Sequence, residues 1–253
     1  MRNRKPVVKI LSTLLILAGI PCAVPARVMA SPPEKSADYA ELRNEDMRAK
    51  MKDEREEDRI DARATLAKST DLYSAIVKGA HGQVPESVLA KAQCVAVIPD
   101  VMTGALIVGG SHGVGIASCR ENNNWSPPAF LKMTSVSLGA QIGAKSSDVV
   151  LFMISDKAKS ALKNGKITLG TDVSVTAGNF DRNFDTSAHG VIAYTRTEGV
   201  FAGASLSGGN LSSDNDDTRA FYGKDATFAS LMSGNSNIVP NPLANGFTGL
   251  LPR

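Results

Sequence analysis

The chain has 253 residues, of which 21% are charged and 5% aromatic, and its formal net charge at pH 7 is +3. Five of the positive charges and none of the negative charges lie in residues 1–30, so residues 31–253 carry a net charge of −2. Nucleic-acid binding requires a strongly basic surface. We therefore expect no nucleic-acid partner.

Residues 1–30 have the features of a secretory signal peptide. A basic start precedes an apolar run at 10–20 (ILSTLLILAGI), which is too short to span a bilayer. Val28 and Ala30 permit cleavage before Ser31. We expect a periplasmic or otherwise exported protein. A lipoprotein form through Cys22 is disfavoured, because glycine and proline stand at positions 19 and 21, where a lipobox has leucine and a small residue.

Residues 31–63 form a charged arm. Between Glu34 and Asp71 there are twelve acidic and nine basic residues, with signs mixed at helical spacing and almost no apolar stripe. This pattern predicts an exposed helix or a partly disordered arm. Residues 34–63 either bind a protein partner or form a solvated helix stabilised by pairs four residues apart.

An amphipathic helix is expected from Leu66, ending at Gly79 and Gly82, and a second helix from Pro85 to about Ala92. A third short helix is expected at 155–162, with Ser155 as its N-cap. Ten apolar runs between them predict strands joined by short connections, and so a mainly antiparallel sheet. These runs are 93–98, 104–110, 113–120, 129–134, 136–144, 148–154, 166–170, 172–178, 190–196 and 199–206. We predict an α+β fold in which N-terminal helices pack on a strongly curled or barrel-like sheet.

Two cysteines remain after the expected signal peptide, Cys94 and Cys119, each in an apolar run on what should be neighbouring strands. In an oxidising compartment such a pair favours a disulfide. Closing this loop of about 25 residues would stabilise the fold by about 3 kcal/mol. Two buried free thiols are the alternative. The pair lacks the ligand spacing of a zinc site.

Three motifs bear on catalysis and metal binding. Residues 109–113 (GGSHG) fit the pattern of a serine nucleophile, with Asp172 or Asp185 and His189 following in hydrolase order. The motif needs a helix after Ser111, and a strand is expected there, so a serine hydrolase is a remote alternative. Residues 181–185 lack the glycine and glutamate of a calcium loop. Residues 214–217 (DNDD) are either a turn between strands or a weak cation site. We predict a non-enzymatic protein with no catalytic residues, metal or cofactor.

Seven apolar and glycine-rich blocks lie between residues 95 and 223. They are 95–99 (VAVIP), 104–110 (GALIVGG), 125–130 (WSPPAF), 137–143 (SLGAQIG), 169–175 (LGTDVSV), 199–203 (GVFAG) and 220–223 (AFYG). In this order the blocks resemble the SYLF family, over about residues 62–231. The resemblance implies a non-enzymatic phospholipid-binding domain at 64–231 and leaves 232–253 as a Gly/Asn/Pro-rich tail that we expect to be flexible. Eukaryotic members carry SH3 or FYVE modules and bind phosphoinositides and actin filaments, whereas bacterial members are commonly exported, with cysteines like Cys94 and Cys119.

The chain departs from the family at 177–182 (AGNFDR), where the family usually reads AGPxGR and where Asp181 would weaken anion binding by Arg182. The resemblance predicts an exported protein that binds phospholipid at the bacterial cell envelope. Anionic headgroups would be bound by a basic patch, or an acyl chain would enter an apolar pocket at the mouth of the sheet. Candidate lipid-binding residues are Lys78, Lys91, Lys132, Lys145, Arg182 and Arg196.

Overall fold

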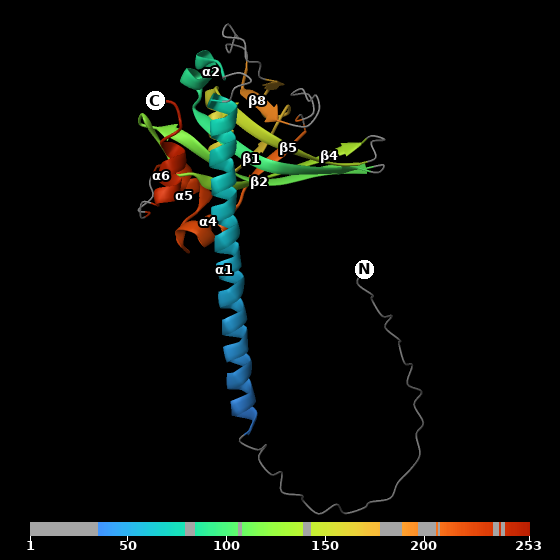
Figure 1. Ribbon diagram of the computed structural model, residues 1–253, viewed down its shortest axis with the longest axis vertical. Coiled ribbons are helices and arrows are strands. Elements are labelled where there is room, and N and C mark those ends of the chain that lie inside the picture. The colour runs from blue at the N-terminus through green and yellow to red at the C-terminus, as the bar shows by residue number, and fades with distance from the viewer. Residues whose placement is uncertain are drawn as a thin grey trace, which may run out of the picture. The chain divides into compact units, whose positions relative to one another are not determined.

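The computed structural model describes residues 35–78, 84–105, 108–138, 143–177, 189–196, 206, 208–234, 238 and 241–253, without side-chain detail at 35–40, 104–109 and 136–145. The chain divides into two units, Met1–Asp46 and Met47–Arg253. The described part of the first unit is the beginning of helix α1. The sheet and the remaining helices belong to the second unit (Figure 1).

Helix α1 runs from Lys35 to Lys78, so the charged stretch and the amphipathic segment after it are both helical. Residues 41–61 are exposed, and Ala62 is the first buried residue. From there Leu66, Ser69 and Tyr73 follow at helical spacing and are each at most 1% exposed. The core face of α1 therefore begins at Ala62.

Two other expected helices are confirmed. Helix α2, Glu86–Lys91, follows Pro85, whose missing N–H would have had no partner at a helix start. Helix α3, Asp156–Lys163, begins after Ser155, whose hydroxyl accepts a hydrogen bond of 3.2 Å from the backbone N–H of Ala158.

The described strands form one curled, mostly antiparallel sheet, which confirms the predicted class (Figure 1). The order is β6-β9-β4-β2-β1-β5-β8-β7, with β3 paired to β2, and β7 runs parallel to β8. Bounds are β1 Cys94–Ala105, β2 Val108–Glu121, β3 Asn124–Trp125, β4 Ala129–Leu138, β5 Gly143–Met153, β6 Lys166–Thr168, β7 Val175–Ala177, β8 Val191–Arg196 and β9 Asn210–Ser213.

The structure corrects the strand boundaries in two places. The predicted strand 104–110 is two strand ends that pair with each other, Gly104 opposite Gly110 and Ala105 opposite Gly109. The predicted strand 136–144 likewise covers the end of β4 and the start of β5. Continuous apolar and glycine composition across a hairpin hides the turn from a sequence pattern. The expected strand 199–206 lies outside the described residues except for Leu206.

Both faces of the sheet are buried where the strands cross the core. On β1, Cys94, Ala96 and Ile98 belong to one buried cluster with residues of α3 and helix α5, Phe228–Met232. Val95 and Val97 face the other cluster, which contains residues of α1, α2, helix α4 at Asn215–Tyr222 and helix α6 at Pro242–Thr248. A strand covered on both sides needs apolar side chains at successive positions. This explains the unbroken run at 94–98.

Residues 232–253, which we expected to form a flexible tail, contribute to the core instead. Helix α6 begins after Asn241, whose side chain accepts a hydrogen bond of 2.9 Å from the N–H of Leu243. Phe247 is fully buried, and its ring packs edge-on against Tyr73 of α1 with centroids 5.8 Å apart. The apolar residues of this segment therefore anchor the end of the chain.

Gly115 of β2 illustrates one reason for glycine within the strands. A Cβ atom at Gly115 of β2 would lie 2.2 Å from the carbonyl oxygen of Val97 and 2.8 Å from the Cα of Ile98. The backbone of β1 occupies the space of a side chain, so only glycine fits there.

Candidate functional site

The structure describes the side chains of four of the six residues predicted to bind lipid. Lys132 and Arg196 are engaged by carboxylates, at 2.8 Å from Asp214 and 2.8 Å from Asp148 respectively. Lys78 and Lys91 are exposed at the ends of α1 and α2, and neither makes an ion pair with another described residue. The side chain of Lys145 and all of Arg182 lie outside the described residues.

The acidic run 214–217 starts a helix, which corrects the expectation of a turn between strands. Asp214 follows β9 and accepts hydrogen bonds from the N–H groups of Asp216 and Asp217, at 3.2 and 3.3 Å, as the N-cap of α4. Its hydrogen bond and charge raise the pKa of Lys132. Burial, then the negative charge of Asp214, raises the pKa of Asp217 to about 6. Lys132 is therefore part of a predominantly acidic site.

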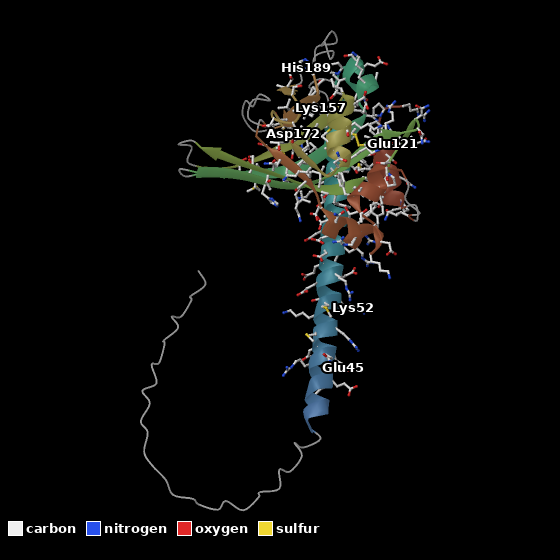
Figure 2. All side chains as sticks on the ribbon, turned by 180° about the vertical axis from the view of Figure 1, so that it is seen from behind. Glu45, Lys52, Glu121, Lys157, Asp172 and His189 are labelled. Carbon is white, nitrogen blue, oxygen red and sulfur yellow. A yellow bond between two sulfur atoms is a disulfide. The ribbon has the colours of Figure 1, made fainter. Side chains whose placement is uncertain are left out.

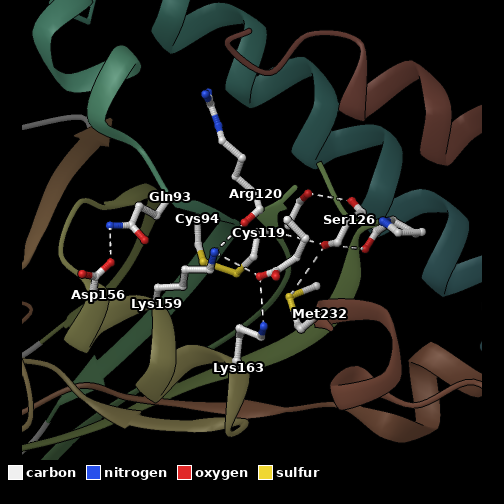
Figure 3. Close-up of a disulfide and its surroundings, with 12 residues drawn as sticks. Gln93, Cys94, Cys119, Arg120, Ser126, Asp156, Lys159, Lys163 and Met232 are labelled. Atoms are coloured by element: carbon white, nitrogen blue, oxygen red, sulfur yellow. Dashed lines mark hydrogen bonds and ion pairs between the residues drawn. A yellow bond between two sulfur atoms is a disulfide. The ribbon is translucent and has the colours of Figure 1, made fainter. Parts of the chain in front are cut away.

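A cationic cluster does form on the opposite side of β1 from α1, around Glu121 at the end of β2 (Figures 2 and 3). The ammonium groups of Lys159 and Lys163 on α3 lie 3.1 and 2.9 Å from the same Glu121 oxygen. Lys159 also donates to the backbone carbonyl of Arg120. Burial would raise the pKa of Glu121, but hydrogen bonds from Lys163 and Lys159 hold it below its ordinary value.

The side chain of Arg120 is not part of this cluster, although it precedes Glu121 on β2. Figure 3 shows its guanidinium pointing away from Lys159 and Lys163, as expected for successive residues of a strand. It lies 5.1 Å from the centroid of the Trp125 ring, and its Nη2 donates to the carbonyl of Pro252 at 2.8 Å. Trp125 Nε1 donates to the same carbonyl at 2.7 Å. Lys159 and Lys163 thus carry two positive charges against the single charge of Glu121.

Two more lysines lie next to this cluster along the chain. Lys157 is exposed on α3, and Lys91 stands two residues before Gln93, which donates to Asp156 Oδ1 at 2.8 Å (Figure 3). Neither lysine has an ion-pair partner among the described side chains. We define Lys91, Lys157, Lys159 and Lys163 as the cationic cluster, with Glu121 and Asp156 as the carboxylates beside it. Of these, only Lys91 was expected from the sequence.

The spacing of residues 157–163 (KAKSALK) contains the signal that was missed. Lys159 and Lys163 are four residues apart, and so they share one face of the short helix that Ser155 was expected to cap. Glu121 gives no such signal, because only the fold brings the end of β2 beside α3.

Cys94 and Cys119 lie directly opposite each other on β1 and β2 and form a disulfide in the structure, with an S–S distance of 2.06 Å (Figure 3). Their chain neighbours Gln93 and Arg120 are joined by a backbone hydrogen bond of 2.7 Å. The disulfide therefore links the two strand ends that carry the edge of the cationic cluster.

The hydrolase geometry is not formed around Ser111. This residue lies inside β2, and its hydroxyl is 2.7 Å from the hydroxyl of Ser135 on β4. The strand continues to Glu121, so no helix follows the serine as a nucleophile elbow requires. His189 has its Nδ1 2.9 Å from the hydroxyl of Thr176. Asp185 lies outside the described residues.

The described residues contain neither a membrane-spanning helix nor a group of metal ligands. No described helix combines the length and apolarity needed to cross a bilayer. Within the described residues there is also no group of three or more His, Cys, Asp or Glu side chains placed to hold a metal ion.

The geometry is that of an α+β domain with a localised cationic surface. Residues 134–252 match a family model described as "Ysc84: Las17-binding protein actin regulator". The match extends through α6, so the family domain includes the segment that we expected to be a tail. The match confirms the resemblance to this family, also called SYLF, that was drawn from the seven sequence blocks.

Relatives include Protein YSC84 of Saccharomyces cerevisiae, 31% identical over 173 residues, which are 65% of this chain and 37% of the relative. LAS seventeen-binding protein 3 of S. cerevisiae strain YJM789 is 30% identical over 69% of this chain and 40% of its own length. SH3 domain-containing YSC84-like protein 1 of Homo sapiens is 30% identical over 60% of this chain and 46% of its own length. The chain thus spans less than half the length of these relatives. No solved structure matches significantly.

Proposed function

We propose that this protein is an exported, non-enzymatic phospholipid-binding protein of the bacterial cell envelope, and that the cationic cluster contacts anionic headgroups. The observation that supports this most directly is the excess of positive charge around Glu121 in a chain whose residues 31–253 have a net charge of −2. Export is supported by the signal-peptide pattern at 1–30 and by the disulfide, a bond typical of oxidising compartments.

The physical argument is local electrostatics. A Lys or Arg close to an anionic membrane surface contributes about 1 kcal/mol to binding. Lys91 and Lys157 are free to make such contacts, because they are exposed and unpaired among the described residues. Lys159 and Lys163 are held in place by Glu121, and Lys159 also by the backbone carbonyl of Arg120. The two paired lysines are thus flanked by two exposed cations.

Vesicle co-sedimentation tests this function. We expect the protein to pellet with vesicles containing phosphatidylglycerol at low salt, to be released at high salt, and to stay in solution with phosphatidylcholine alone. Replacing both Lys91 and Lys157 by Glu should weaken pelleting by about tenfold or more, since four units of charge change at the membrane contact. Failure of the unmodified protein to pellet at low salt would refute the proposal.

The matched control is Lys50→Glu with Lys52→Glu, which changes the net charge equally. Both lysines are exposed on α1, and Figure 2 shows Lys52 on the helix well away from Lys157 and Glu121. We expect this variant to pellet like the unmodified protein. Equal loss of binding in both variants would show that net charge, not the cationic cluster, controls the interaction.

A second candidate function is protein binding by the charged arm. Two relatives are named for binding LAS seventeen, a protein partner. Here residues 41–61 are exposed on α1 and available for contacts. A deletion that tests the arm must stop at Asp61, because Ala62 is fully buried. Retention of a native partner after deletion of 34–61 would exclude the arm as its binding site.

A further inference from the structure

Signs are mixed over Glu34–Asp71 as a whole, but the charges of residues 47–61 on α1 separate into two blocks. Residues 47–52 (MRAKMK) contain three basic and no acidic residues, for a net charge of +3. Residues 53–61 (DEREEDRID) contain six acidic and two basic residues, for a net charge of −4. We call them the basic block and the acidic block. An ordinary solvated helix mixes its signs within each turn, so this separation calls for an explanation.

Neither block is covered by another part of the chain that the structure describes. All residues from 47 to 61 are exposed, including the apolar Met47, Met51 and Ile60, which are 51%, 50% and 54% exposed. Arg59 pairs with Glu56 at 2.7 Å, inside the acidic block. For the described side chains, no ion pair joins the basic block to any carboxylate. The three cations of the basic block therefore remain available to a second molecule.

We propose that α1 pairs antiparallel with α1 of a second copy of this chain. Antiparallel alignment about the boundary between Lys52 and Asp53 sets the basic block of each copy against the acidic block of the other. The pair of helices then contains two contacts between a basic block of charge +3 and an acidic block of charge −4, and both contacts are attractive. Parallel alignment would place +3 against +3 and −4 against −4. The charge pattern is thus self-complementary in one orientation and repulsive in the other.

Other occupants fit this surface less well. An anionic membrane would repel the acidic block, and the net charge of residues 47–61 is −1. A foreign helix would need an acidic block opposite the basic block of α1 and a basic block opposite the acidic block. A second copy of α1 supplies both blocks without further assumption. The association is independent of the proposed lipid binding, which involves the cationic cluster.

The contact is expected to be weak and sensitive to salt. A helix of 15 residues is about 22 Å long, and exposed ion pairs are individually modest. Packed helices lie about 8–10 Å apart, close to the screening length at physiological salt. Self-association should therefore be measurable at low salt and high protein concentration and fall about tenfold or more at high salt.

Charge-block variants test the proposal. Reversing the basic block with Arg48→Glu, Lys50→Glu and Lys52→Glu leaves two acidic blocks, so this variant should be monomeric in sedimentation equilibrium at low salt. Adding Asp53→Lys, Glu54→Lys and Glu57→Lys to the same chain gives blocks of −3 and +2 and should restore association. As a matched control, Lys166→Glu, Lys224→Glu and Arg253→Glu change three exposed charges outside α1 and outside the cationic cluster and should leave association intact.

Cross-linking between copies tests the orientation. Protein labelled with heavy nitrogen is mixed with unlabelled protein and treated with a carbodiimide, which joins lysine amines to carboxylates in contact. Mixed-isotope peptides joining Lys50 or Lys52 to Glu54, Glu56 or Glu57 are expected. Their absence, a monomeric unmodified protein at low salt, or a basic-block variant that still associates would each overturn the proposal. Circular dichroism of every variant verifies that α1 remains helical.

Discussion

At the residue scale, the carboxylate of Asp214 joins two parts of the fold. It caps α4 by accepting from two backbone N–H groups and pairs with Lys132 of β4 at 2.8 Å. Its side chain is 1% exposed, whereas that of Lys132 is 41% exposed. A buried charge of this kind is tolerated because its hydrogen-bonding partners replace water.

Replacement of Asp214 by Ala is expected to lower the free energy of unfolding by about 2 kcal/mol, from loss of the helix cap and of the ion pair. Urea denaturation, monitored by circular dichroism, measures this change in the free energy of unfolding. Asp216→Ala is the control, because the Asp216 side chain is 84% exposed and its pair with Arg219 should contribute at most about 0.5 kcal/mol. Equal effects of the two substitutions would contradict the role given to Asp214.

Asp217 should make stability depend on pH. Its pKa is raised to about 6 in the folded protein from an ordinary value of 3.8, first by burial and then by Asp214. The folded state therefore binds the proton more tightly than the unfolded state, and stability falls as the pH rises from about 4 to about 6. Asp217→Asn should remove this loss and stabilise the protein at pH 7 by about 1 kcal/mol, a figure reduced for solvent screening. Denaturation at pH 4 should show little difference between the two proteins.

At the scale of elements, local capping chemistry decided which helices were predictable. Ser155 before α3 and Pro85 before α2 are strong start signals next to apolar periodicity, and both helices were expected from the sequence. Asn241-Pro242 is a comparable signal before α6. The surrounding glycine and asparagine residues favoured a flexible tail over a helix in the sequence-based prediction. The sequence does not show that Phe247 is buried, because this burial depends on a contact with Tyr73, 174 positions earlier in the chain. Tertiary packing of this kind leaves no local pattern.

Removal of the Phe247 ring distinguishes a packed α6 from a flexible tail. Phe247→Ala should lower the free energy of unfolding by about 3–4 kcal/mol, since the side chain is fully buried against Tyr73. Leu243→Ala on the same helix, where the side chain is 47% exposed, should cost less than about 1 kcal/mol. A Phe247 variant as stable as the unmodified protein would mean that α6 does not anchor the core.

At the scale of the whole molecule, the α+β class and the mostly antiparallel sheet were predictable because connections of two to six residues leave no room for crossover helices. The candidate site was not predictable from the sequence. Lys91 was expected, but Lys159 and Lys163 meet Glu121 only because α3 lies against the end of β2. Sites assembled from separate elements require the tertiary fold, even when each element is correctly predicted.

The Cys94–Cys119 bond should stabilise the whole second unit, because it closes a loop of 25 residues across adjacent strands. In the chain-entropy description such a loop contributes about 3 kcal/mol, which corresponds to about 6–12 °C in melting temperature for a domain of this size. Denaturing the oxidised protein and the Cys94→Ala/Cys119→Ala variant, each with and without reductant, measures this contribution. Reductant should lower the melting temperature of the unmodified protein toward that of the variant and leave the variant unchanged. If the variant melts with the oxidised protein, the bond adds nothing to stability.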